Sequence, residues 1–255
     1  MPAAARYLFI LGTFALLPAS GAPADPPAAT RPAAATTPEA RAQRIRQALA
    51  ALGDSDPVAR DQAYAQLVSL TLDDLPLLRD AVARARPLQA SQLAVLRPVV
   101  THVWLTAQPY RPAAEGFLGV VLPPFAAADV NELEGESPVI VVDRIPGFCG
   151  YAALRDGDVL LEIEEAARLR NKYDLIAVVK ATAPGDLIHL RVSRQGRVLR
   201  VAARLDARPV EATGANAEAQ MEGFKNARAK AAADYWDATF APLVPAPAAA
   251  ATADR

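Results

Sequence analysis

The sequence predicts an α+β protein in which helical and strand-rich segments follow one another along the chain. Apolar residues recur at helical spacing across 38–107, which predicts several short helices. Apolar and polar residues alternate in parts of 113–209, which is typical of β-strands. A further helical pattern covers 215–241. We therefore expect an α-helical domain, a strand-rich domain and a C-terminal helix, in that order.

Composition limits the classes of function. The chain has 255 residues, is 52% hydrophobic and carries a formal net charge of −1, so one or two domains with a real core are expected. Nucleic-acid binding needs a basic excess that this chain lacks, so we expect no nucleic-acid partner. A single cysteine, Cys149, excludes an intrachain disulfide and a cysteine-based metal cluster. No metal or other cofactor is expected.

Residues 1–24 have the pattern of a signal peptide. Arg6 precedes an apolar run at 7–17 that is too short to span a bilayer comfortably, and small residues at 22–24 fit a cleavage site. We expect an exported protein, periplasmic or secreted. An uncleaved N-terminal anchor is the alternative. No later segment reaches membrane-spanning length, so no integral span is expected after cleavage.

Two segments rich in proline and alanine flank the folded regions, a linker at 25–37 and a tail at 242–255. Such compositions bury too little apolar surface to fold alone, and we expect both segments to be disordered.

The helical region carries clear start signals. A capping residue followed by proline occurs at 37–38 and again at 56–57. Thr71 and Asp74 have the spacing of a capping box. Pro98 predicts a kink or break in the last helix of this region.

Part of this region resembles a helical hairpin of the HEAT-repeat kind. The resemblance depends on Asp56, Arg60, Ala63, Leu67 and the Leu-Pro-Leu-Leu run at 75–78. These motifs cover about two repeats, whereas solenoids usually need three or more. A plain four-helix cap without a binding role is the alternative.

The motifs in 113–209 resemble a PDZ domain of the bacterial periplasmic-protease type. Gly-Phe-Leu-Gly-Val at 116–120 comes first, followed by Ile-Pro-Gly at 145–147. Arg-Asp-Gly-Asp-Val-Leu at 155–160 and Pro-Gly-Asp at 184–186 then precede strands. The resemblance implies a PDZ-like, partly open β-barrel with two helices.

The resemblance also implies a binding loop made of Phe117, Leu118, Gly119 and Val120. Successive backbone N–H groups in a glycine-containing loop can hold the carboxylate of a peptide C-terminus. The N–H groups of 118–120 would face that carboxylate, and the side chains of Leu118 and Val120 would floor the pocket. An ordinary strand start is the alternative for this loop.

The helix expected at 171–181 would form the second wall of this groove. Asp174 and Val178 lie one turn apart and share a face, where the resemblance implies that they contact ligand side chains. Alternatively, Val178 fills the core and Asp174 caps the helix.

Two departures from the PDZ pattern leave the openness of the groove undecided. The stretch 121–138 is long and acidic and contains two prolines, which remove ladder donors. Glu164-Glu165 stands where the family usually has Asn-Gly.

No pattern for catalysis is present. The chain lacks a Gly-x-Ser-Gly loop, a Ser-x-x-Lys pair and a His-Glu-x-x-His motif. His102 and His189 are far apart in sequence. Cys149 is expected to be a buried small apolar residue. We therefore expect a protein that is not an enzyme.

The C-terminal helical pattern has an apolar stripe followed by clustered aromatic residues at 235–240, which either anchor a partner or membrane surface or pack onto the rest of the chain. The expected stripe comprises Met221, Phe224, Ala227, Ala231, Tyr235 and Phe240.

Together these features predict an exported, non-catalytic adaptor or scaffold that binds peptide segments or C-terminal tails of partner proteins by strand addition. Two alternatives remain open. One is a regulatory subunit of a separate envelope protease, and the other is a structural envelope protein with an occluded groove.

Overall fold

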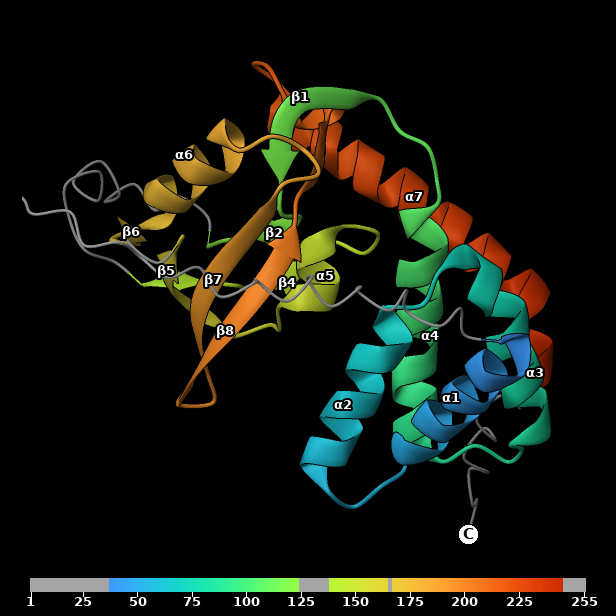
Figure 1. Ribbon diagram of the computed structural model, residues 1–255. Coiled ribbons are helices and arrows are strands. Elements are labelled where there is room, and N and C mark those ends of the chain that lie inside the picture. Colours follow the sequence, from blue (N-terminus) through green and yellow to red (C-terminus); the bar gives the residue numbers. More distant parts are fainter. Residues whose placement is uncertain (1–36, 124–137, 165–166, 245–255) are drawn as a thin grey trace, which may run out of the picture. The chain divides into compact units, whose positions relative to one another are not determined.

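The computed structural model describes residues 37–123, 138–164 and 167–244 (Figure 1). The predicted signal peptide at 1–24 lies outside the described residues. So do the 25–37 linker, apart from Thr37, and the tail beyond Val244. Among the described helices, none combines the length and the apolar character that crossing a membrane requires.

Four α-helices come first: α1 (Pro38–Ala51), α2 (Pro57–Val68), α3 (Leu75–Arg84) and α4 (Ala90–Thr106). The predicted caps are confirmed, because Thr37 Oγ1 accepts the Ala40 N–H (3.3 Å) and Asp56 Oδ1 accepts the Val58 N–H (2.9 Å). The break expected in α4 does not occur, because the helix continues through Pro98.

The capping box before α3 is also confirmed. The N–H and Oγ1 groups of Thr71 donate to Asp74 Oδ2 at 3.0 and 2.9 Å, within the 3₁₀ turn η1 (Leu72–Asp74). Asp74 also forms an ion pair with Arg41 of α1. Burial alone would raise the pKa of this carboxyl, but the bonds from Thr71 and Arg41 outweigh it and lower the pKa. The turn is thereby attached to the first helix.

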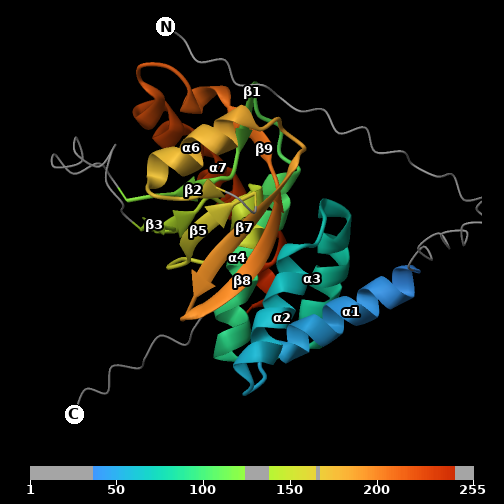
Figure 2. The same cartoon turned by 60° about the vertical axis from the view of Figure 1, so that its left-hand side comes forward.

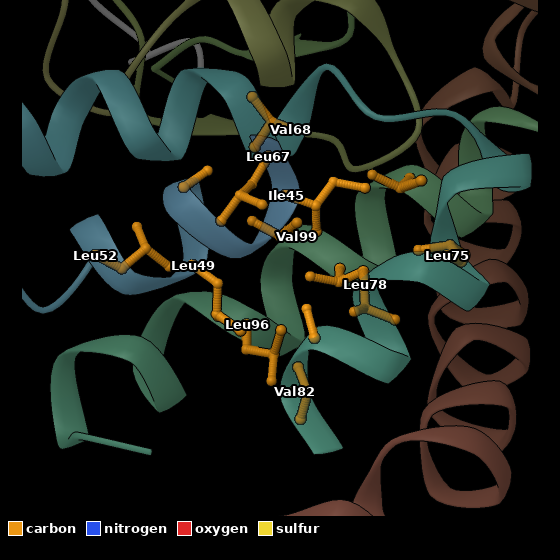
Figure 3. Close-up of a cluster of buried hydrophobic side chains, with 14 of the residues drawn as sticks. Ile45, Leu49, Leu52, Leu67, Val68, Leu75, Leu78, Val82, Leu96 and Val99 are labelled. Atoms are coloured by element: carbon orange, nitrogen blue, oxygen red, sulfur yellow. The ribbon is translucent and has the colours of Figure 1, made fainter. Parts of the chain in front are cut away.

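One apolar core fills the space between these helices (Figure 3). Its labelled side chains are all at most 3% exposed: Ile45, Leu49, Leu52, Leu67, Val68, Leu75, Leu78, Val82, Leu96 and Val99. Trp236 and Phe240, from the C-terminal end of the chain, belong to the same core, as does Tyr151. The aromatic residues at 235–240 therefore pack within the chain, as one of the two alternatives expected.

Nine strands and three more α-helices complete the described part (Figure 1). The strands are β1 (Pro112–Phe117), β2 (Val120–Val121), β3 (Val139–Ile140), β4 (Asp143–Arg144), β5 (Val159–Ile163), β6 (Ala167–Arg168), β7 (Leu187–Arg194), β8 (Arg197–Arg204) and β9 (Asp206–Pro209). The helices are α5 (Cys149–Ala153), α6 (Lys172–Ala181) and α7 (Ala217–Thr239). Short 3₁₀ turns flank α7: η3 (Val210–Ala212) and η4 (Ala241–Leu243).

The strands form three open antiparallel sheets. β1 pairs with β9, β2 pairs with β4, and the largest sheet has the order β3-β5-β7-β8, with β6 on β5. No closed barrel is formed within the described residues. The observed class is therefore α+β, with an N-terminal helical region and open sheets.

The extended segment 139–144 contributes to two sheets. It is divided into β3 and β4, because β3 pairs with β5 while β4 pairs with β2. Between them, the Val141 N–H donates to Asp158 O and the Val142 N–H donates to Val121 O, both at 2.9 Å. Successive N–H groups of an extended chain point to opposite sides. This segment therefore joins β2 to the largest sheet.

A second apolar core lies among the strands and α6. On β7 the predicted alternation is confirmed, since Ile188, Leu190 and Val192 are each at most 1% exposed. The turn that follows has positive φ at Gln195 (50°) and Gly196 (77°), as a two-residue hairpin between twisted strands requires.

The buried face of α7 differs from the expected stripe. Ala227 and Ala231 are exposed, whereas Arg228, Ala232 and Trp236 are buried. The helix is therefore rotated by about one residue from the expected orientation, roughly 100°. One of the buried positions is occupied by Arg228, which a prediction from apolar residues would not place in the interior.

A buried histidine connects α4 to the strand-bearing region. His102 is 3% exposed, its Nδ1 accepts the Gly147 N–H (3.0 Å), and its ring stacks on Tyr151 with centroids 4.6 Å apart. Burial lowers the pKa of His102 to about 4, and the positive charge of Arg144 acts in the same direction. The imidazole is therefore neutral at neutral pH.

This burial predicts a pH-dependent stability. The unfolded chain has an ordinary histidine pKa of about 6.5, so it binds the proton more readily than the folded chain does. The stability that depends on the neutral form of His102 is complete above about pH 6.5 and is lost as the pH falls through about 4, a total of about 3 kcal/mol. Urea unfolding of the wild type and His102→Gln across this range measures the difference. Equal pH slopes for the two proteins would contradict the prediction.

Candidate functional site

The loop of expected binding residues joins β1 to β2. Phe117 ends β1, Val120 begins β2, and Leu118 and Gly119 connect them. Gly119 has φ of +71°, a left-handed conformation that side-chain-bearing residues rarely adopt. Leu118 is 2% exposed and belongs to the second core. The backbone therefore turns sharply here while one side chain anchors it.

Hydrogen bonds from neighbouring segments hold the carbonyl groups of this loop. The Gly150 N–H donates to Leu118 O and the Ile145 N–H donates to Gly119 O, both at 2.8 Å. The N–H groups of Leu118 and Gly119 make no hydrogen bond to any other described residue. Since amide groups need partners, two adjacent backbone donors remain to be satisfied by solvent or by a ligand.

The register of β2 leaves its other edge available. The bond from Ile145 to Gly119 flanks the Val120–Arg144 pair, which is therefore a pair without hydrogen bonds of its own. The N–H and C=O of Val120 then point away from β4. Among the described strands, β4 is the only neighbour of β2. The far edge of β2 can thus accept an additional strand.

A groove of about 470 Å³ lies between this loop and α6, which runs beside β2 (Figure 2). Its lining is mostly apolar: Gly116, Phe117, Leu118, Gly119, Val120, Leu122, Tyr173, Leu175, Ile176, Val179, Lys180 and Arg208. Both of the charged residues in this lining are basic, so the described walls of the groove favour a negative group.

Two contacts define how the groove is oriented. The Gly116 N–H donates to Thr182 O (3.0 Å), which places the end of β1 at the C-terminal end of α6. Lys172 Nζ lies 3.5 Å from Pro123 O, which places the chain after β2 at the N-terminal end of that helix. The groove therefore runs from the unbonded amides, near Lys180, toward Tyr173.

Asp174 and Val178 do not line the groove, unlike the four loop residues. Asp174 accepts the Arg170 N–H (3.0 Å) and pairs with the Arg170 guanidinium (3.1 Å), which lowers the pKa of its carboxyl. Val178 packs against the second core. Asn171 caps α6, because its Oδ1 accepts the Tyr173 N–H (3.0 Å).

Other residues of α6 take the place of the two expected ones. Tyr173, Ile176 and Lys180 follow spacings of three and four, the sequence signal of a helix face. The same helix offers an equally regular face containing Asp174 and Val178. Periodicity alone therefore could not select which face borders the groove.

The single cysteine lies behind the loop. Asp206 Oδ2 accepts the Cys149 N–H (2.6 Å), and the thiol lies 3.6 Å from Phe117 O. Burial and the Asp206 carboxylate raise the pKa of the thiol to about 12, so it stays protonated and a poor nucleophile. Among the described residues, no group of three or more His, Cys, Asp or Glu could hold a metal ion.

No protein-family profile and no curated protein matches the chain. Solved structures match in part. The HtrA-type protease AlgW with a tripeptide matches at TM-score 0.32 and 24% identity, covering 38% of this chain and 33% of that one. The HtrA3 PDZ domain bound to a phage-derived ligand (FGRWV) matches at TM-score 0.31 and 18% identity, covering 41% and 98%.

A photosystem II D1 C-terminal processing protease matches at TM-score 0.29 and 14% identity, covering 65% of this chain and 43% of that one. The present chain thus spans about a third of the AlgW structure and less than half of the processing protease. All these TM-scores lie below 0.5, and the matches do not assign the chain to a family.

The close approach of α5 to the loop can be tested at Gly150. A Cβ at this position would overlap Leu118 O and come within 2.9 Å of Val120 Cγ1. We expect Gly150→Ala to lower the free energy of unfolding by about 1–3 kcal/mol. Gly223→Ala is the control, because nothing lies within 4 Å there and a helical alanine should stabilise by about 0.5–1 kcal/mol. Denaturant unfolding measures the stability of both variants. If Gly150→Ala is as stable as the wild type, α5 does not approach the loop as closely as these contacts imply.

Proposed function

We propose that this chain is an exported, non-catalytic adaptor or scaffold with a PDZ-like domain that binds C-terminal tails of partner proteins by strand addition. The supporting observation is the pair of N–H groups, at Leu118 and Gly119, without a partner among the described residues and at one end of an apolar groove. Export is proposed from the signal-peptide pattern at 1–24.

The terminal carboxylate of the ligand would bind at these two amides. A carboxylate loses solvation when it enters an apolar groove, and fixed N–H donors replace the lost hydrogen bonds. The bonds from Gly150 and Ile145 hold the loop, so the donors need little ordering when the ligand arrives.

The orientation of the groove determines the direction of the bound peptide. With its carboxylate at Leu118 and Gly119, the ligand would extend along the open edge of β2 toward Tyr173. Its chain would run antiparallel to β2 and pair with the N–H and C=O of Val120. Main-chain hydrogen bonds do not depend on the side chains of the peptide, so they would contribute affinity for peptides of many sequences.

The side chains of the groove would select an apolar last residue. Ile176 and Val179 of α6 face the loop across the groove and offer apolar surface near the carboxylate position. Lys180 and Arg208 add positive charge there. Short peptides lose conformational freedom on binding, so we expect dissociation constants on the order of micromolar.

The helical region would serve as the second part of the scaffold. The hairpins formed by α1 to α4 are where the HEAT-like resemblance lies, and a solenoid-like binding role for them remains part of the proposal. No metal or other cofactor is needed for either part.

Peptide titration tests the proposal. Short fluorescent peptides ending in Val, Leu or Phe should bind saturably, and Ile176→Glu should weaken binding roughly tenfold because it places a charge in the apolar groove. Ala177→Glu is the matched control, because this exposed neighbour on α6 is not part of the groove lining. Fluorescence anisotropy measures each affinity. Absence of saturable binding at high micromolar peptide would refute the proposal.

A second titration tests the charge at the carboxylate end. We expect Lys180→Glu to weaken binding of a free-carboxylate peptide by about two- to fivefold, because the substitution reverses an exposed charge. The same peptide with an amidated C-terminus should bind more weakly to the wild type and respond less to the substitution. Equal responses of both peptides would place the carboxylate elsewhere.

A further inference from the structure

A buried arginine lies on α7, behind the candidate groove. Arg228 is 9% exposed and occupies the inward face of the helix. Its Nη2 donates to Leu105 O (2.7 Å) and its Nη1 to Gln108 O (3.4 Å). Leu105 lies in the last turn of α4 and Gln108 just beyond it, in the region where carbonyl groups lack the usual intrahelical partners. Arg228 therefore caps α4 from another helix and attaches α7 to it.

Aromatic rings surround the same guanidinium. Its carbon lies 5.2 Å from the ring centre of Phe224, 5.5 Å from Phe148 and 5.8 Å from Tyr110. These distances are within the range of cation–π attraction, which strengthens when the cation is desolvated. No described carboxylate lies within ion-pair distance of Arg228. Carbonyl groups and rings contact its guanidinium directly, and the Asp206 carboxylate interacts with it from a longer distance.

Phe148 contacts both Arg228 and the binding loop. It is 1% exposed, and a Cβ added at Gly119 would overlap the Cβ of Phe148, so the loop backbone lies directly on this residue. The ring of Phe117 meets Phe148 edge to face at 4.9 Å. A displacement of Phe148 would therefore move the turn that presents the two unbonded amides.

The residues on either side of Phe148 in the sequence, Gly147 and Cys149, are also held by hydrogen bonds. The Gly147 N–H donates to His102 of α4, and the space beside Gly147 is occupied by Arg228 Nη2. The Cys149 N–H donates to Asp206. The Cys149 thiol lies 3.6 Å from Phe117 O and 3.7 Å from Leu118 O. Segment 147–149 therefore contacts α4 on one side and the binding loop on the other.

We propose that Arg228 is a positioning residue for the groove: by holding Phe148 it fixes the loop that carries the Leu118 and Gly119 amides, so that peptide binding and the packing of α7 on α4 stabilise each other. The proposal is an extension of the proposed function, because it assumes that the groove binds a peptide. Arg228 itself touches no ligand. Coupling between two sites is reciprocal, so each event must strengthen the other by the same factor.

Affinity provides the first measurement. Arg228→Met keeps an apolar chain of similar length but removes the bonds to α4 and the cation, and it should weaken peptide binding about five- to tenfold. Arg97→Met is the matched control: the Arg97 guanidinium lies 6.0 Å from the Trp236 ring and is not part of the groove or of segment 147–149. This control should change affinity less than about twofold. Arg228→Lys, which retains charge but only one donor group, should fall between.

Amide hydrogen exchange provides a readout that a general loss of stability would not move. Saturating peptide should slow exchange at the end of α4 and along α7 in the wild type and in Arg97→Met, but not in Arg228→Met. If Arg228→Met does not fold, Phe224→Leu replaces it, because this half-exposed ring contacts Arg228 with less structural cost. It should weaken binding about two- to threefold with the same loss of protection.

The outcomes separate the two proposals. If wild-type protein binds no peptide, the groove function and the role of Arg228 both fall. If wild type binds and Arg228→Met or Phe224→Leu binds equally well, with the distant protection retained, the positioning role is refuted and the groove function stands. Weaker binding together with lost protection at α4 and α7 supports the coupling.

Discussion

The two hydrogen bonds that Gly150 and Ile145 donate to the carbonyl groups of Leu118 and Gly119 are the constraint on which the site depends. They settle which side of the turn faces the protein. With the carbonyl groups engaged, the N–H groups point elsewhere, and the register of β2 turns Val120 to the same open edge. An apolar groove with polar donors at one end is a consequence of this backbone arrangement rather than of any ionisable side chain.

Two arginines extend this constraint into the surrounding fold. Arg144 Nη1 donates to the carbonyl groups of Tyr151 and Leu154 at the end of α5, both at 3.0 Å, and its guanidinium lies over the Tyr151 ring. Arg228 does the same for the end of α4. In both cases a planar cation with several donors satisfies helix-end carbonyls while aromatic rings replace part of its hydration. These carbonyl groups therefore have hydrogen-bond donors although they lie away from solvent.

The helical region and the strand-bearing region are not energetically independent. Trp236 of α7 and Phe240, which follows it, complete the core of α1 to α4, while Phe224 and Arg228 of α7 pack against Phe148. α7 runs beside α4 (Figure 1). A change that loosens α7 should therefore lower the stability of both regions.

Several features of the site followed directly from local sequence. Gly119 marked a sharp turn, the flanking apolar residues marked strands, and the cap–proline pairs marked the helix starts, because each of these signals acts through backbone conformation within a few residues. The placement of Phe117 to Val120 beside a helix was implied by the resemblance to PDZ domains. The absence of Asp174 and Val178 from the groove lining and the unexpected burial of Arg228 have a common cause: both depend on how a helix is rotated about its axis.

The sequence alone determined the class of the fold and the order of its elements, since period, capping and glycine conformation are short-range effects. The carboxylate-binding role of residues 117–120 is implied by the resemblance to PDZ domains and stays a prediction. Tertiary structure alone decided that Ile176 rather than Val178 borders the groove, that the Leu118 and Gly119 carbonyls face inward, and that Arg228 is buried among aromatic rings. The physical reason is that packing among residues distant in sequence sets helix rotation and hydrogen-bond direction, and such packing leaves no signal in local periodicity.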